Sequence, residues 1–144
     1  PTLQEVFDLV NQNCVINIEL KTYETAAKVT ELIEKYVSEK NWQYDCFLVS
    51  SFDWNALQQV RFLNDEIPIG ILTETNLDLA LAFAKFIQAK SIHPHFHLLT
   101  KENTERMQEK GLQVFPWTVN EQEDLKKIKS FNVNGIITDF PDRI

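Results

Sequence analysis

Residues 15–21 of this 144-residue chain alternate strictly between apolar and polar side chains, which constrains the fold more than any other feature. Side chains of a strand alternate between its two faces, so this stretch predicts one apolar and one polar face. The apolar face carries Ile16, Ile18 and Leu20, and the polar face carries Asn17, Glu19 and Lys21. An ordinary half-exposed strand would turn the polar row toward water.

Further along the chain, short apolar segments alternate with amphipathic ones, which predicts parallel strands covered by helices. Strands are expected at 14–20, 46–51, 67–72, 91–95, 112–119 and 135–139. Helices are expected at 3–10, 22–40, 54–63, 77–90, 101–110 and after 120. Six such strands could form an open doubly wound sheet or six-eighths of a barrel. In a barrel, the polar row of residues 15–21 would face the mouth, where active sites lie.

Several helix ends can be predicted from the residues that cap them. Thr2 and Glu5 have the spacing of a capping box, and Asp53, Thr100 and Asn120 are expected N-caps. Gly111 suits a helix C-terminus.

Composition limits the class of protein. The hydrophobic content of 44% argues against disorder, and the net charge of −7 argues against nucleic-acid binding. No apolar run approaches the ~18 residues of a membrane span. No linker or low-complexity segment interrupts the chain, so we expect one domain over residues 1–144.

Cys14 and Cys46 are expected to be buried core residues rather than a disulfide or metal site. The first residue is Pro1, so the start of the parent protein need not be present. The compartment stays open, with the cytoplasm slightly favoured.

Five segments in order resemble the glycerophosphodiester phosphodiesterase family, over essentially the whole chain. They are residues 15–21, Leu-Val-Ser-Ser-Phe at 48–52, His-Pro-His at 93–95, Phe-Pro-Trp-Thr-Val-Asn at 115–120 and Gly-Ile-Ile-Thr-Asp-Phe-Pro-Asp at 135–142. The resemblance implies an α/β fold comprising the C-terminal six βα units of a TIM (β/α)8 barrel. It also implies hydrolysis of glycerophosphodiesters to glycerol 3-phosphate and an alcohol, with Mg²⁺ or Ca²⁺ as cofactor.

The family's earlier motifs do not occur in this sequence. These are a strand with His-Arg-Gly, a strand with Glu-x-Asp and a later His-Asp pair. We therefore expect that the first two strands are absent and that no catalytic histidine lies in this chain, which would be part of an enzyme.

The resemblance implies roles for several residues. Glu19 would be a metal ligand and Lys21 would contact the phosphoryl group, although the two could simply form an ion pair. Trp117 would form a wall for glycerol, and His95, Phe52 and Asn120 are further substrate-binding candidates. Core packing is an alternative for Trp117 and Phe52, as is helix capping for Asn120.

His93, His95 and His97 share one strand face by spacing, which raises the possibility of a zinc site. The spacing is not a standard zinc signature and lacks a nearby cysteine or carboxylate ligand. We expect His95 to line the pocket and the other two to be structural or exposed.

Two other functions remain open. A truncated barrel could be a non-catalytic binding or assembly module that oligomerises through its open edges. An unrelated flavodoxin-like domain is the third possibility, although no glycine-rich phosphate loop is present.

Overall fold

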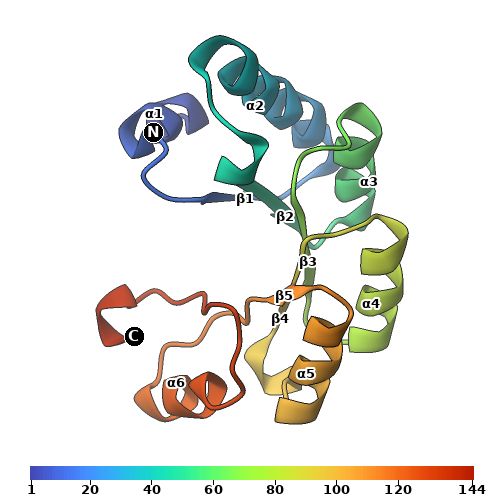
Figure 1. Cartoon of the computed structure of the whole chain (residues 1–144), viewed down its shortest axis with the longest axis vertical. Helices are drawn as coiled ribbons and strands as arrows, with labels where there is room; N and C mark the ends of the chain where they lie inside the picture. Colours follow the sequence, from blue (N-terminus) through green and yellow to red (C-terminus); the bar gives the residue numbers. More distant parts are fainter. The chain divides into compact units, whose positions relative to one another are not determined.

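A computed structural model describes all 144 residues of the chain. The chain divides into two compact units, Pro1–Ile69 and Gly70–Ile144. Strands and helices alternate along both units, as the colours of Figure 1 show. None of the helices is long and apolar enough to cross a bilayer.

The first unit contains two parallel strands and the helices that cover them. Its elements are α1 (Leu3–Val10), β1 (Ile16–Leu20), η1 (Tyr23–Thr25), α2 (Ala26–Lys40), η2 (Tyr44–Cys46), β2 (Phe47–Ser51) and α3 (Trp54–Leu63). The pairing of β1 with β2 places Glu19 opposite Ser50. Helices α2 and α3 pack against each other, and α3 contacts β2.

The core of the first unit is an aromatic cluster of Phe7, Tyr36, Trp42 and Phe47, all buried. Phe7 meets Tyr36 edge to face with ring centroids 5.0 Å apart, and Trp42 stacks on Phe47 at 5.1 Å. Such aromatic pairs add to the stabilisation that comes from burial alone. The predicted capping box of Thr2 and Glu5 is confirmed, and it fixes the helix from which Phe7 enters the cluster.

The second unit repeats the strand–helix alternation. Its elements are β3 (Ile69–Thr73, whose first residue ends the first unit), α4 (Leu77–Phe86), β4 (Ser91–Pro94), η3 (Phe96–Leu98), α5 (Lys101–Glu109), β5 (Gln113–Val114), α6 (Gln122–Lys129) and η4 (Pro141–Arg143). β4 pairs in parallel with both β3 and β5. Helix α4 packs on β4, and α5 packs on β5.

The last two predicted strands are present in a less regular form. The fifth is regular only over Gln113–Val114, but Trp117 N–H still donates to the Pro94 carbonyl at 3.1 Å. Pro94 on the facing strand has no N–H to donate to β5, so the β4–β5 ladder lacks one hydrogen bond at that position. The sixth is an extended segment in which Ile137 donates to the Pro116 carbonyl at 2.9 Å and accepts from Val119 N–H at 3.0 Å.

Helix α4 ends at Phe86, four residues before the predicted end. Gln88 has φ +54°, and Ala89 N–H donates back to the Ala84 carbonyl at 2.8 Å. This is the backbone pattern of a helix C-terminus, which usually has glycine at the left-handed position. The sequence gives no glycine there, so the stop was not predicted.

The expected burial of both cysteines is wrong. Cys14 is exposed in the bend before β1, and Cys46 is half-buried at the end of η2; both are free thiols. Both lie just outside the regular strands that were expected to bury them, because β1 begins at Ile16 and β2 at Phe47.

Candidate active site

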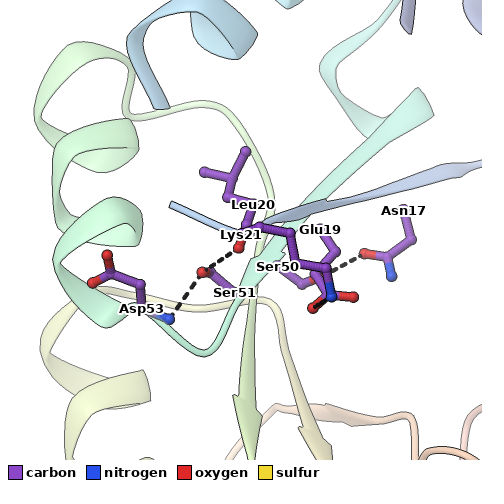
Figure 2. Close-up of polar contacts among 7 residues, drawn as sticks. All are labelled: Asn17, Glu19, Leu20, Lys21, Ser50, Ser51 and Asp53. Carbon is purple, nitrogen blue, oxygen red and sulfur yellow. Dashed lines mark hydrogen bonds and ion pairs between the residues drawn. The ribbon is translucent and has the colours of Figure 1, made fainter. Parts of the chain in front are cut away.

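The polar face of β1 is formed as the alternation predicted. Ile16, Ile18 and Leu20 are buried, whereas Asn17 and Glu19 point to the opposite face. Lys21 follows the strand directly, and its Nζ donates to Glu19 Oε1 at 2.5 Å (Figure 2). About a third of the Glu19 side chain is exposed, compared with 76% of the Lys21 side chain. The carboxylate and the ammonium group therefore meet at an accessible carboxyl end of a strand.

A buried hydroxyl supports this polar face from the neighbouring strand. Ser50 lies opposite Glu19 in the β1–β2 register, and its Oγ donates to Asn17 Oδ1 at 3.0 Å. Ser50 is fully buried, so this bond satisfies a hydroxyl group that water cannot reach. The sequence placed Asn17 on this face, but it did not indicate the bond to Ser50.

Ser51 links three elements at the same strand ends. Its buried Oγ donates to the Leu20 carbonyl at 2.7 Å and accepts from Asp53 N–H at 2.9 Å (Figure 2). Asp53 in turn caps α3, accepting from Asn55 and Ala56 N–H as predicted. Sequence reasoning did not single out Ser51, because a serine in a buried strand gives no signal of its partners.

The chain offers limited material for a metal centre. The Glu19 carboxylate is the kind of oxygen ligand that Mg²⁺ and Ca²⁺ take. However, no three His, Cys, Asp or Glu side chains in the chain gather closely enough to hold a metal ion. Glu19 therefore fits as one ligand among several, and the chain alone does not complete a site. The same observation gives no support to a zinc site at His93, His95 and His97.

Phe52 follows β2 and is 46% exposed, so it is not an ordinary core residue.

The three histidines do not share one strand face, because β4 ends at Pro94 and His97 lies in η3. His93 is buried, His95 is half-buried and His97 is exposed. The burial of His93 and the exposure of His97 agree with the expectation that these two are structural or exposed, whereas the expectation that His95 lines a pocket stays a prediction.

Trp117 lies beside His95 in the second unit. The two rings meet edge to face with centroids 4.9 Å apart, and the backbones of the two residues form a parallel bridge. Trp117 Nε1 donates to the His93 carbonyl at 2.7 Å, which fixes the plane of the indole. The half-buried indole and imidazole thus form a joined pair at the ends of β4 and β5.

The prediction that Asn120 caps the following helix is wrong. The N-cap of α6 is Glu121, and no side chain caps that helix. The Asn120 amide instead contacts the last segment of the chain: its Nδ2 donates to Asp139 Oδ2 at 2.8 Å, and its Oδ1 accepts from Asp139 N–H at 3.0 Å and from Thr138 Oγ1 at 3.1 Å.

His93 has an unusual environment for an imidazole. Its Nε2 lies 2.8 Å from Ser91 Oγ, and its buried Nδ1 has no hydrogen-bond partner. Burial lowers the pKa of His93 to about 4, so the ring is neutral near pH 7. The ring occupies space left by Gly70, where a Cβ would lie 2.6 Å from His93 Nε2.

The candidate residues thus form two local groups. Glu19 and Lys21 are in contact in the first unit, and His95 and Trp117 are in contact in the second. Parallel strands that pair in chain order within each unit, each followed by a helix and with polar or aromatic side chains at the carboxyl ends, are typical of the (β/α)-barrel class.

Comparisons with known proteins identify the family. The Glycerophosphoryl diester phosphodiesterase family matches residues 1–143. A glycerophosphodiester phosphodiesterase of Caldanaerobacter subterraneus is 32% identical over the whole chain, and one of Bacillus altitudinis is 36% identical over 99% of it. The chain belongs to the glycerophosphoryl diester phosphodiesterase family. It spans 60% of the length of each of these two relatives.

Solved structures agree on the fold. A crystal structure from Silicibacter pomeroyi, provisionally assigned as a glycerophosphoryl diester phosphodiesterase, matches 99% of the chain and 54% of its own, with TM-score 0.86 and 27% identity. An Oleispira antarctica phosphodiesterase in complex with the product sn-glycerol-3-phosphate matches the whole chain and 59% of its own, with TM-score 0.83 and 22% identity. The fold is that of part of a TIM barrel, as the sequence implied.

Proposed function

We propose that the protein containing this chain hydrolyses glycerophosphodiesters to glycerol 3-phosphate and an alcohol. Membership of the family and the names of the two relatives support this reaction. The Oleispira antarctica neighbour, which holds sn-glycerol-3-phosphate, supports a small-molecule substrate of this chemistry. The observation in the chain itself that carries the proposal is the Glu19–Lys21 pair at the carboxyl end of β1.

In this proposal the two members of the pair have different partners. Glu19 would supply one oxygen ligand to a divalent cation, Mg²⁺ or Ca²⁺, and the remaining ligands would come from elsewhere. When bound, such a cation neutralises charge on the phosphoryl group. Lys21 would place its ammonium group near a phosphoryl oxygen, where it stabilises negative charge that develops during cleavage. Its present bond to Glu19 leaves most of the lysine side chain exposed and able to turn toward a ligand.

The aromatic residues would shape the organic part of the substrate site. The Trp117 indole would form a wall for the glycerol moiety, held in its plane by the bond to the His93 carbonyl and by the His95 ring. Phe52 would contribute an accessible apolar surface. Asn120 would act on the site indirectly, because its amide is bonded to Thr138 and Asp139.

The test is hydrolysis of glycerophosphodiesters by the protein expressed from its complete reading frame, with added Mg²⁺ or Ca²⁺. Glu19→Gln and Lys21→Met should each lower kcat/KM by about 100-fold, because each removes a charge that acts on the phosphoryl group. Glu31→Gln is the matched control, since Glu31 is an exposed carboxylate on α2.

Equal activity in the wild type and both site variants would contradict the proposed roles. Complete lack of turnover by the wild type, with or without cations, would instead support the non-catalytic binding or assembly module.

A further inference from the structure

The second unit contains a groove that none of the candidate site residues lines. It has a volume of about 530 Å³ and runs along the C-terminal half of α4 and the turn between α5 and β5. Its lining residues are Leu81, Ala82, Ala84, Lys85, Gln88, Ala89, Lys110 and Leu112. Small-molecule sites commonly have volumes of about 300–1,000 Å³.

The floor of the groove is apolar. Ala84 and Leu112 are buried, and Leu81 is half-buried. Three of the lining residues are alanines, whose short side chains leave space beside the helix that longer side chains would fill. Helix α4 ends at Phe86, and Gln88 and Ala89 just after it also line this space. An alkyl chain could therefore replace water against these side chains.

The charges on the groove are of one sign. Lys85 and Lys110 are its only charged lining residues, and both are exposed, although the chain carries a net charge of −7. Each lysine lies near the C-terminal end of a helix, where a cation is favourable to the helix dipole. The helix dipole accounts for the two cations, but it does not account for the apolar residues that line the groove beside them.

We propose that this groove binds a single-chain amphiphile with an anionic headgroup. The alkyl chain would lie against Leu81, Ala84 and Leu112, and the headgroup would pair with Lys85 and Lys110. The alkyl chain of such a ligand matches the apolar lining residues, and its anionic headgroup matches the two lysines. The proposal does not depend on the proposed hydrolytic activity.

The test is calorimetric titration of the protein, expressed from its complete reading frame, with decyl phosphate below its micelle concentration. Saturating glycerol 3-phosphate is present throughout to block any phosphate site at Lys21. We expect decyl phosphate to bind more tightly than inorganic phosphate or decyltrimethylammonium.

Ala82→Phe, which places a ring in the groove at an exposed helix position, should abolish the binding of decyl phosphate. The double variant Lys85→Gln/Lys110→Gln should weaken it by about tenfold, because it removes both cations.

Lys90→Gln is the matched control, because Lys90 is exposed and close in sequence but does not line the groove. Its affinity should equal that of the wild type. The proposal is wrong if decyl phosphate does not bind, or if it binds Ala82→Phe and the double lysine variant as tightly as the wild type. Binding only to anionic vesicles, and not to monomeric decyl phosphate, would also overturn it in favour of a lipid surface as the partner.

Discussion

At the scale of single residues, His93 is a polar side chain that lies in the protein interior, where its ring fills space between neighbouring residues. The ring meets Phe115 edge to face with centroids 5.4 Å apart and fills the space above Gly70. One ring nitrogen is bonded to Ser91 Oγ, and the other is buried without a partner. A neutral imidazole tolerates this environment much better than a charged one, since burying an unpaired charge is costly.

The environment of His93 predicts a loss of stability in mild acid. The pKa of His93 is about 4 in the folded protein, below the ordinary value of 6.5. The unfolded chain therefore takes up a proton that the folded protein does not, and the free energy of unfolding falls as the pH drops from 6.5 to 4. The full loss is on the order of 3 kcal/mol. Urea unfolding between pH 7 and pH 4 should show a shallower pH dependence for His93→Gln than for the wild type.

His97→Gln is the control for that comparison, because His97 is exposed. It should keep the pH dependence of the wild type. The same pH dependence in His93→Gln as in the wild type would show that His93 titrates normally in the folded protein.

At the scale of secondary-structure elements, single side chains hold strand ends to their neighbours. Ser51 joins the last carbonyl of β1 to the residue that caps α3. In the second unit, Asn120 joins the end of the fifth strand region to Thr138 and Asp139, and its carbonyl accepts from Arg143 Nη1 at 2.9 Å. These bonds act where the regular ladders stop, so they set the positions of the loops that carry candidate site residues.

Removing the Ser51 hydroxyl should destabilise the protein noticeably. Ser51→Ala deletes two hydrogen bonds at a fully buried position, and the Leu20 carbonyl and Asp53 N–H lose a partner. We expect the free energy of unfolding to fall by about 1–3 kcal/mol. Chemical denaturation of Ser51→Ala measures this change. Ser38→Ala, on the exposed surface of α2, is the control and should change stability by less than about 0.5 kcal/mol. Equal effects of the two substitutions would show that the link between β1 and α3 contributes nothing.

At the scale of the whole molecule, β1 forms an edge that no other strand of the chain pairs with. β1 is the first strand of the sheet order, and Val15 beside it is 60% exposed. An open strand edge with apolar side chains is a site for association with another chain. Association through open strand edges, which the sequence suggested, stays a prediction, and the edge at β1 is one place where it can be tested.

A charge beside β1 should therefore reduce self-association of residues 1–144. We expect the polypeptide to associate as its concentration rises, and Val15→Lys to shift the equilibrium toward monomer. Light scattering across a concentration series measures both effects. Leu9→Lys is the control, because Leu9 is even more exposed but lies on α1. If Leu9→Lys were as effective as Val15→Lys, general surface hydrophobicity and not the strand edge would cause the association.

The sequence by itself determined the order of strands and helices, the buried and polar faces of β1 and most helix starts. These depend on local periodicity and on caps within three residues, as at Thr2, Asp53 and Thr100. The ordered motifs also sufficed to identify the family.

Only the tertiary structure decided the polar contacts. Asn120 has the side chain of a helix cap, yet its partners lie 18 and 19 residues away, at Thr138 and Asp139. Likewise, Ser50 bonds to Asn17 and Ser51 to the Leu20 carbonyl across a β1–β2 register that no local pattern encodes. Gln88, which lines the groove beside α4, has a left-handed backbone that no glycine in the sequence indicates. Periodicity reports which face of an element is buried, whereas these features depend on which residues of different elements the folded backbone brings within a few ångströms.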